Sequence, residues 1–290
     1  MIVVTGATGQ LGRLVLKALL EKTSPSRVIA AVRSPDKAQD LKQAGVQVRA
    51  ADYDRPETLA AAFAGAEKVL LISGNTLGKR VSQHRAVIDA ARKAGVQLFA
   101  YTSVLKAPTT ALMVGPDHRE TEAAITASGL PSVVLRNGWY SENYLFRAAG
   151  AVKTGVLLGC AGEGRISAAP RADYAQAAAT VLTSPNQAGR TYELAGDQSF
   201  TLAELAAELS RQIGRPMRYQ NVTESEFTEA LERNGIPSAY APMMARSDAL
   251  SAQGALLETG RQLSQLLGRA TTPIGAVIEQ AIRAGQIPKA

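Results

Sequence analysis

Short apolar runs recur along the first half of the chain, and segments with helical spacing of apolar residues separate them. Nearly every position of a run is apolar, rather than every second one, which is typical of strands buried on both faces of a parallel sheet. The alternation predicts an α/β fold with a Rossmann-type, doubly wound parallel sheet. The predicted strands span residues 2–6, 27–33, 46–52, 68–73, 96–103 and 132–137.

Several helix starts carry side-chain signals. A Ser-Pro pair at residues 34–35 is typical of an N-cap followed by a proline in the first turn. Thr201 with Glu204, and Thr223 with Glu226, have the spacing of capping boxes, in which each residue bonds the backbone of the other. We therefore expect helices to begin at these three places.

The alternation changes after residue 137. Residues 171–182 have the pattern of a helix, and residues 190–196 that of one more strand, which would return to the sheet. We expect residues 1–136 to form a Rossmann domain and residues 137–290 a smaller C-terminal α/β lobe. Proline and methionine residues within 236–254 indicate a lid or packing element.

Composition and charge narrow the class of protein. The chain has 290 residues, 46% of them apolar, and a single cysteine, so an intramolecular disulfide is impossible. Neither a leader peptide nor a membrane-spanning run is recognisable, which predicts a cytoplasmic protein. The net charge of +7 is scattered, with no basic block among aromatics, so it suits a phosphorylated small ligand better than nucleic acid.

A glycine-rich segment, "TGATGQLGR", follows the first predicted strand and opens a helix. In this context the spacing Gly-x-x-Gly-x-x-Gly predicts a dinucleotide-binding loop. Such a loop needs a tight turn, close backbone approach to a pyrophosphate, and a helix N-terminus directed at the phosphates. The predicted cofactor-binding residues here are Gly6, Ala7, Thr8, Gly9, Gln10 and Leu11.

Arg33 stands at the end of the second predicted strand, where an NAD enzyme usually has Asp or Glu. A guanidinium cannot accept a hydrogen bond from the ribose, but it can bind a 2′-phosphate through two parallel hydrogen bonds. Lys37, one helical turn further on, would add positive charge. The sequence therefore predicts NADPH as the cofactor, unless Arg33 merely faces solvent.

Polar residues also follow the third and fourth predicted strands. Asp52 ends the third strand and is a candidate partner for the adenine amino group. Ser73, Gly74 and Asn75 end the fourth strand beside the glycine loop and should border the nicotinamide ribose. Ligands of open α/β sheets bind at these carboxyl ends of strands, which supports both assignments.

Motifs of one enzyme family are spread over nearly the whole chain. They are "GATGQLG" at 6–12, "QHR" at 83–85, "AYTS" at 100–103, "LRNGWYSENY" at 135–144, "RADYA" at 171–175 and "YELAGD" at 192–197. Together with Arg33 they make the chain resemble the NmrA-like group of atypical short-chain dehydrogenases. Within that group it is most similar to bacterial type 2 NAD(P)H:quinone oxidoreductases and triphenylmethane reductases. The resemblance implies NADPH binding and two-electron reduction of quinones.

The resemblance also implies that residues 138–143 contact the cofactor. Their chemistry suits a nicotinamide wall, with flat aromatic surfaces, hydrogen-bonding groups and a glycine that permits close approach. Packing between two lobes is the alternative for the aromatic residues. Arg171 is a candidate counter-charge near the cofactor, or else an ordinary first-turn helix residue. The wall residues are Gly138, Trp139, Tyr140, Ser141, Glu142 and Asn143.

The catalytic pair of typical short-chain dehydrogenases, Tyr-x-x-x-Lys on one helix face, does not occur at any tyrosine of this chain. At the expected helix stand His118 and Glu122, which also suit a capping histidine with a carboxylate one turn later. Reduction of a ketone needs an acid held against the alkoxide, whereas a hydroquinone anion is delocalised and solvent can protonate it. The missing pair therefore favours a quinone acceptor, with no dedicated catalytic residue and little effect of His118→Ala.

Two functions of different kinds are compatible with these residues. In the first, residues 1–136 form an NADP-binding domain and residues 137–290 a substrate-binding lobe. The enzyme then transfers a hydride directly from NADPH to a small-molecule quinone, in a pocket floored by Trp139 and covered by Tyr240, Met243 and Met244. In the second, the chain is an inactive NADP(H)-binding redox sensor of the NmrA type. One cysteine and two histidines in separate elements give no zinc site, and no second nucleotide loop offers a place for flavin.

Overall fold

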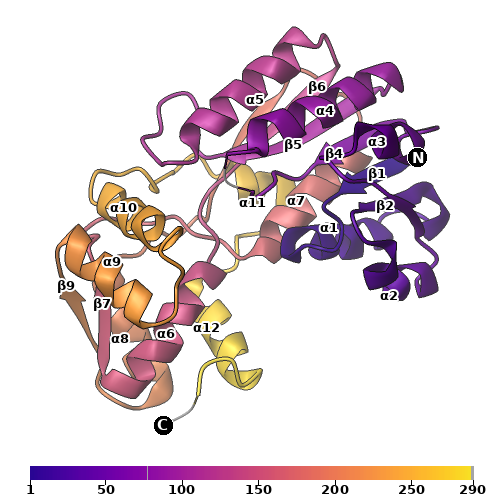
Figure 1. Ribbon diagram of the computed structural model, residues 1–290. Coiled ribbons are helices and arrows are strands. Elements are labelled where there is room, and N and C mark those ends of the chain that lie inside the picture. The colour runs from indigo at the N-terminus through magenta and orange to yellow at the C-terminus, as the bar shows by residue number, and fades with distance from the viewer. Residues whose placement is uncertain (77, 289–290) are drawn as a thin grey trace.

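The computed structural model describes residues 1–76 and 78–288 and contains a central seven-stranded parallel sheet (Figure 1). The strand order is β3-β2-β1-β4-β5-β6-β8, in which the chain reverses direction of winding between β1 and β4. This is the predicted doubly wound arrangement, and all seven predicted strands are confirmed. They are β1 Ile2–Thr5, β2 Val28–Val32, β3 Gln47–Ala50, β4 Lys68–Leu71, β5 Leu98–Val104, β6 Ser132–Asn137 and β8 Thr191–Leu194.

Helices cover both faces of the sheet, because successive strand residues point to opposite sides and both sides are apolar. Val4 and Leu70 pack with one helical layer, whereas Val3 and Leu71 pack with the other. The first layer contains α1 Gln10–Leu20, α2 Gln39–Gln43, α7 Arg171–Thr183 and α11 Gln262–Leu267, and the second contains α3 Pro56–Ala62, α4 Arg80–Lys93 and α5 Gly115–Ala127. No helix among the described residues combines the length and apolar character needed to cross a bilayer.

A second group of elements lies beside the carboxyl ends of the strands, at the lower left of Figure 1. Its centre is a two-stranded parallel sheet of β7 Val156–Gly159 and β9 Arg218–Asn221. The helices around it are α6 Glu142–Thr154, α8 Leu202–Ile213, α9 Glu224–Arg233, α10 Ala241–Ser251 and α12 Ile274–Arg283. The chain enters the small sheet at β7 and then returns to the main sheet at β8. The division into two domains at residue 136 stays a prediction.

The helix-start signals have different outcomes. Both capping boxes are confirmed, with the Thr201 side chain opening α8 and the Thr223 side chain opening α9. The Ser34 side chain makes no capping bond, and a short 3-10 helix, Pro35–Ala38, precedes α2 there. Proline fixes the backbone of its own residue, but it does not select an α-helix over a 3-10 turn.

Candidate active site

The glycine loop turns sharply between β1 and α1. Gly6 has φ +59°, and its carbonyl oxygen accepts a hydrogen bond of 2.9 Å from the Gly9 amide. A Cβ atom on Gly12 would lie 2.3 Å from the same carbonyl oxygen, so only glycine fits there. Helix α1 begins without a side-chain cap and without an acidic residue in its first turn. Its first backbone N–H groups are therefore suited to bind an anion.

A cleft of about 990 Å³ starts at this loop and runs along the carboxyl ends of the strands. Among the predicted cofactor-binding residues, Ala7, Ser141 and Glu142 do not line it. Ala7 is buried in the core behind the loop, and Ser141 is fully buried. The cleft brings the others together: Gly6, Thr8, Gly9, Gln10, Leu11, Arg33, Ser73, Gly74, Asn75, Gly138, Trp139, Tyr140, Asn143 and Arg171.

Arg33 lies at one end of the cleft, just beyond β2, with Lys37 beside it. Its side chain is exposed and has no carboxylate partner within the described chain. The nearby Arg13, in contrast, is paired with Asp40 and donates a second hydrogen bond to the Lys37 carbonyl oxygen. The guanidinium of Arg33 is therefore available for a ligand anion. Asp52, the predicted adenine partner, lines the same cleft.

The loop after β4 is held from behind by two side chains of α4. The Gly74 amide donates a hydrogen bond of 3.0 Å to His84 Nε2, and Arg80 Nε donates one of 2.7 Å to the Gly74 carbonyl oxygen. Arg80 is in turn paired with Asp117 of α5 at 2.6 Å. Both backbone polar groups of Gly74 are thus fixed, which sets the position of Ser73 and Asn75 in the cleft.

Burial keeps both histidines neutral, and this makes stability depend on pH. Desolvation, with a smaller contribution from Arg80, lowers the pKa of His84 and of His118 to about 3. The unfolded chain takes up protons near its ordinary pKa of about 6.5, so the stabilisation is complete above that pH and is lost as pH falls. Between about pH 6.5 and pH 5, we expect the free energy of unfolding to fall by up to about 1.4 kcal/mol per pH unit for each histidine.

This slope can be measured by urea unfolding at closely spaced pH values. The variant His84→Gln should lose about half of the slope over this interval, because one of the two titrating groups is removed. A free energy of unfolding that does not change between about pH 6.5 and pH 5 would contradict the assignment of neutral, buried histidines.

Gly138 lines the cleft and also packs closely against its neighbours in the fold. Its amide donates a hydrogen bond of 2.7 Å to the Leu194 carbonyl oxygen of β8. A Cβ atom there would lie 3.0 Å from that oxygen and 3.1 Å from the Tyr174 hydroxyl. Packing against β8 and α7 therefore already requires a glycine at the cleft, whatever the ligand needs.

Arg171 is fixed beside the aromatic wall. Its guanidinium carbon lies 4.3 Å from the centre of the Tyr140 ring, and Nη2 donates a hydrogen bond of 3.2 Å to Asn143 Oδ1. The Glu142 carboxylate is 3.4 Å from Nη1 and also accepts a hydrogen bond from the Arg171 amide. Arg171 is thus more than a solvated first-turn residue, because three wall residues hold its charge at the cleft.

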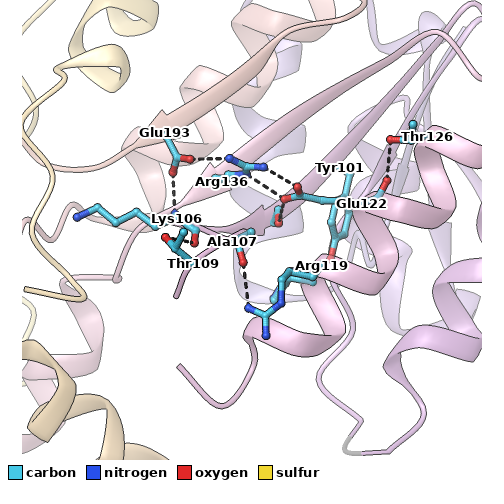
Figure 2. Close-up of polar contacts among 11 residues, drawn as sticks. Tyr101, Lys106, Ala107, Thr109, Arg119, Glu122, Thr126, Arg136 and Glu193 are labelled. Atoms are coloured by element: carbon cyan, nitrogen blue, oxygen red, sulfur yellow. Dashed lines mark hydrogen bonds and ion pairs between the residues drawn. The ribbon is translucent and has the colours of Figure 1, made fainter. Parts of the chain in front are cut away.

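Glu122 is engaged in a polar network between α5 and three strands (Figure 2). It accepts hydrogen bonds from Arg136 Nε at 3.0 Å and Nη2 at 2.7 Å, and from Ser103 Oγ at 2.6 Å. Arg136 also donates a hydrogen bond of 2.8 Å from Nη1 to Glu193. The hydrogen bonds to the two carboxylates raise the pKa of Arg136, and the one to Glu122 has the larger effect. The Glu122 carboxylate therefore ties α5 to β5 and β6, and its hydrogen bonds are made with Ser103 and Arg136 rather than with His118.

A second cavity, of about 440 Å³, adjoins the cleft at the aromatic wall. Trp139, Asn143 and Arg171 line both spaces. Its other walls are largely apolar, and the predicted positions of Met243 and Met244 are confirmed. The lining also includes Glu142, Tyr144, Phe146, Arg147, Phe227, Ile236 and Asp248, but Tyr240, which is 39% exposed, is absent from it.

Several lining residues were not predicted from the sequence. Asn137 is 6% exposed, and its Oδ1 atom is buried without a partner among the described residues. A polar residue at the end of an apolar strand is a signal that would have found it. Gln83 belongs to the "QHR" motif but was not assigned to the site, whereas Tyr53 and Arg80 carry no local signal, because only the tertiary fold brings them to the cleft.

Comparisons with known proteins agree with the geometry. The model of the NmrA-like family matches residues 1–272. Quinone oxidoreductase 2 of Escherichia coli strain K12 is 47% identical over 274 residues, covering 94% of this chain and 96% of that protein. An E. coli NADPH-dependent quinone oxidoreductase complexed with NADPH superposes with a TM-score of 0.95 at 46% identity, over 97% of this chain and 100% of that one. A Citrobacter sp. triphenylmethane reductase complexed with NADP(H) gives 0.94 at 37% identity, with the same coverage.

Proposed function

The chain belongs to the NmrA-like family, and we propose that it is an NADPH-dependent quinone oxidoreductase. The observation that carries the proposal is the junction of the two spaces at Trp139, Asn143 and Arg171, because an acceptor in the apolar cavity would meet the cleft there. The likeness to E. coli quinone oxidoreductase over nearly the whole length of both chains supports the same activity.

The residues of the cleft fit NADPH. The uncapped start of α1 suits the pyrophosphate, and Arg33, unpaired among the described residues, suits the 2′-phosphate. The buried and unpartnered Oδ1 of Asn137 is an acceptor at the cleft near the wall. We assign direct contact with the cofactor to the residues that line the cleft. Ala7, Ser141 and Glu142 contribute indirectly, because they support the glycine loop and the aromatic wall.

When bound, NADPH supplies a hydride, so that a quinone becomes a hydroquinone monoanion, NADP⁺ leaves, and a proton from water completes the hydroquinone. The protein orients the reactants, which is the main requirement of such a transfer. Trp139 gives a flat surface where the two spaces meet, and Arg171 keeps a positive charge beside it. The apolar side chains Phe146, Phe227, Ile236, Met243 and Met244 exclude water from the acceptor side.

The enzyme hypothesis and the sensor hypothesis predict different results in a simple assay. Purified protein is mixed anaerobically with NADPH or NADH and a benzoquinone, and loss of the reduced nicotinamide is followed against a control without protein. An enzyme gives saturable turnover with a preference for NADPH. Tight NADPH binding without turnover of quinones or dyes would replace the enzyme by the sensor. The apolar cavity beside the wall is the observation that favours the enzyme.

A further inference from the structure

Three aromatic rings form a buried cluster behind the cleft. The ring centres of His84 and Tyr101 are 5.5 Å apart with an interplanar angle of 72°, and those of Tyr101 and His118 are 5.8 Å apart at 35°. Tyr101 is fully buried on β5, whereas His118 of α5 lines the cleft. These are the two histidines of the chain, so the protonation state of each can be followed separately.

The hydrogen bonds of His84 fix its tautomer. Its Nε2 atom accepts from the Gly74 amide, which can only donate, so the ring proton must be on Nδ1. Nδ1 then donates to Thr121 Oγ1 at 2.9 Å, and the Thr121 hydroxyl donates to the Asp117 carbonyl oxygen at 2.8 Å. His84 therefore supports the loop at Gly74 and offers no group to the cleft.

The contact of His118 with Tyr101 assigns its ring proton to the nitrogen that His84 leaves unprotonated, Nε2. Its Nδ1 atom lies 2.6 Å from the Tyr101 hydroxyl oxygen. Burial raises the pKa of Tyr101, so its hydroxyl keeps its proton. The hydroxyl also has Ser73 and Thr121 as neighbours, but Nδ1 of His118 is a stronger acceptor than either hydroxyl oxygen, so we assign the hydrogen bond of Tyr101 to Nδ1. The ring proton is then on Nε2, on the opposite side of the ring.

The Nε2 atom of His118 remains available on the side of the cleft. Within the described chain Nε2 has no hydrogen-bond partner. It is also not fully buried, although the residue as a whole is only 6% exposed. The charged group that acts on the ring is Arg80, which is itself paired with Asp117. Burial, with the positive charge of Arg80, disfavours a second positive charge on the ring, so the group facing the cleft is a neutral N–H donor.

We propose that a quinone reaches from the acceptor cavity past Trp139 into the cleft that His118 lines. There His118, held by Tyr101 as the neutral Nε2–H tautomer, donates a hydrogen bond to the quinone oxygen that gains negative charge during reduction. This assignment rests on the proposed function. The donor stabilises the hydroquinone anion without transferring its proton, which still comes from water. It therefore replaces the expectation that His118→Ala has little effect, which considered only proton transfer.

The tautomers can be measured without cofactor or substrate. In protein labelled with ¹⁵N at histidine, long-range ¹H–¹⁵N spectra distinguish Nδ1–H, Nε2–H and doubly protonated rings. We expect one ring of each neutral tautomer, unchanged between about pH 5 and pH 8, and His84→Gln assigns the remaining signal to His118. A His118 ring that is protonated on Nδ1, or that titrates near its ordinary pKa of about 6.5, would overturn the proposal.

Kinetics then test the acceptor contact. His118→Phe keeps a ring but removes the donor, and it should lower kcat for benzoquinone about a hundredfold with little change in the Kd of NADPH. His118→Gln places an amide N–H near the position of Nε2 and should restore most of kcat. Tyr101→Phe, which removes only the tautomer lock, should lie between wild type and His118→Phe.

The outcomes separate the two proposals. If the wild type reduces benzoquinone and His118→Phe does so equally well, the role of His118 is wrong and the function stands. If His118→Phe weakens NADPH binding and leaves kcat unchanged, the donor serves the cofactor and the acceptor contact is wrong. If the wild type does not reduce quinones, the proposed function fails, whatever the spectra show.

Discussion

Replacing Arg33 with aspartate will weaken NADPH binding by about a hundredfold or more and leave NADH binding nearly unchanged. A charge-assisted hydrogen bond contributes about 1.5–3 kcal/mol, and the variant also places a negative charge beside the 2′-phosphate, so a loss of about 3 kcal/mol is expected. Arg33 is suited to this role because it is exposed at the end of the cleft and has no carboxylate partner in the described part of the chain. Calorimetric titration with both cofactors measures the two dissociation constants.

Arg27→Asp is the matched control for this prediction. Arg27 precedes the same strand, β2, at its opposite end, and it is paired with Glu67 away from the cleft. The Arg27→Asp variant has the same change in net charge as Arg33→Asp, but its ratio of NADPH affinity to NADH affinity should equal that of the wild type. Equal losses of both cofactors in Arg33→Asp would show that Arg33 does not contact the 2′-phosphate.

Asp248→Ala will be among the most destabilising single changes in the smaller group of elements. Asp248 of α10 is 5% exposed and pairs with Arg147 of α6 at 2.8 Å, and its second oxygen accepts a hydrogen bond of 2.9 Å from the Cys160 amide. Removal of one partner leaves the Arg147 charge buried and unpaired, which costs about 3–5 kcal/mol. Because a 1 kcal/mol loss shifts Tm by about 2–4 °C in a chain of this size, Tm should fall by about 10 °C.

The neighbouring pair Arg246–Glu224 provides the control. Its side chains are 46% and 41% exposed, and their closest approach is 3.3 Å. Glu224→Ala should therefore cost less than about 1 kcal/mol. Similar melting temperatures of the two variants would contradict the view that the buried pair holds α10, with Met243 and Met244, over the acceptor cavity.

The centre of the large sheet could be predicted because β1, β2 and β5 are buried at every position and are largely apolar. The two strands of the small sheet were missed for the opposite reason. Each of β7 and β9 has only four residues, several of them partly exposed, and their pairing joins segments about sixty residues apart. No local pattern of apolar residues records such a pairing, which depends on the helices around it.

The site shows the same division between local and tertiary signals. The glycine loop and Arg33 were predictable because short segments next to single strands determine them. The Tyr101–His118 pair joins a strand to a helix, and the support of Gly74 by Arg80 and His84 joins a loop to a helix. The spacing of His118 and Glu122 indicated the helix α5 that borders the cleft. In the structure His118 lines the cleft, whereas Glu122 is hydrogen-bonded to Arg136.

A single-turnover experiment with deuterated cofactor tests the central claim most directly. Flavin-free protein, NADPH or its analogue deuterated at the transferable position, and benzoquinone are mixed anaerobically in a single turnover. Direct reduction predicts one hydroquinone for each NADPH consumed, with slower turnover of the deuterated cofactor. Absence of hydroquinone in the flavin-free protein, or its appearance only after flavin is added, would contradict direct hydride transfer from NADPH to the quinone.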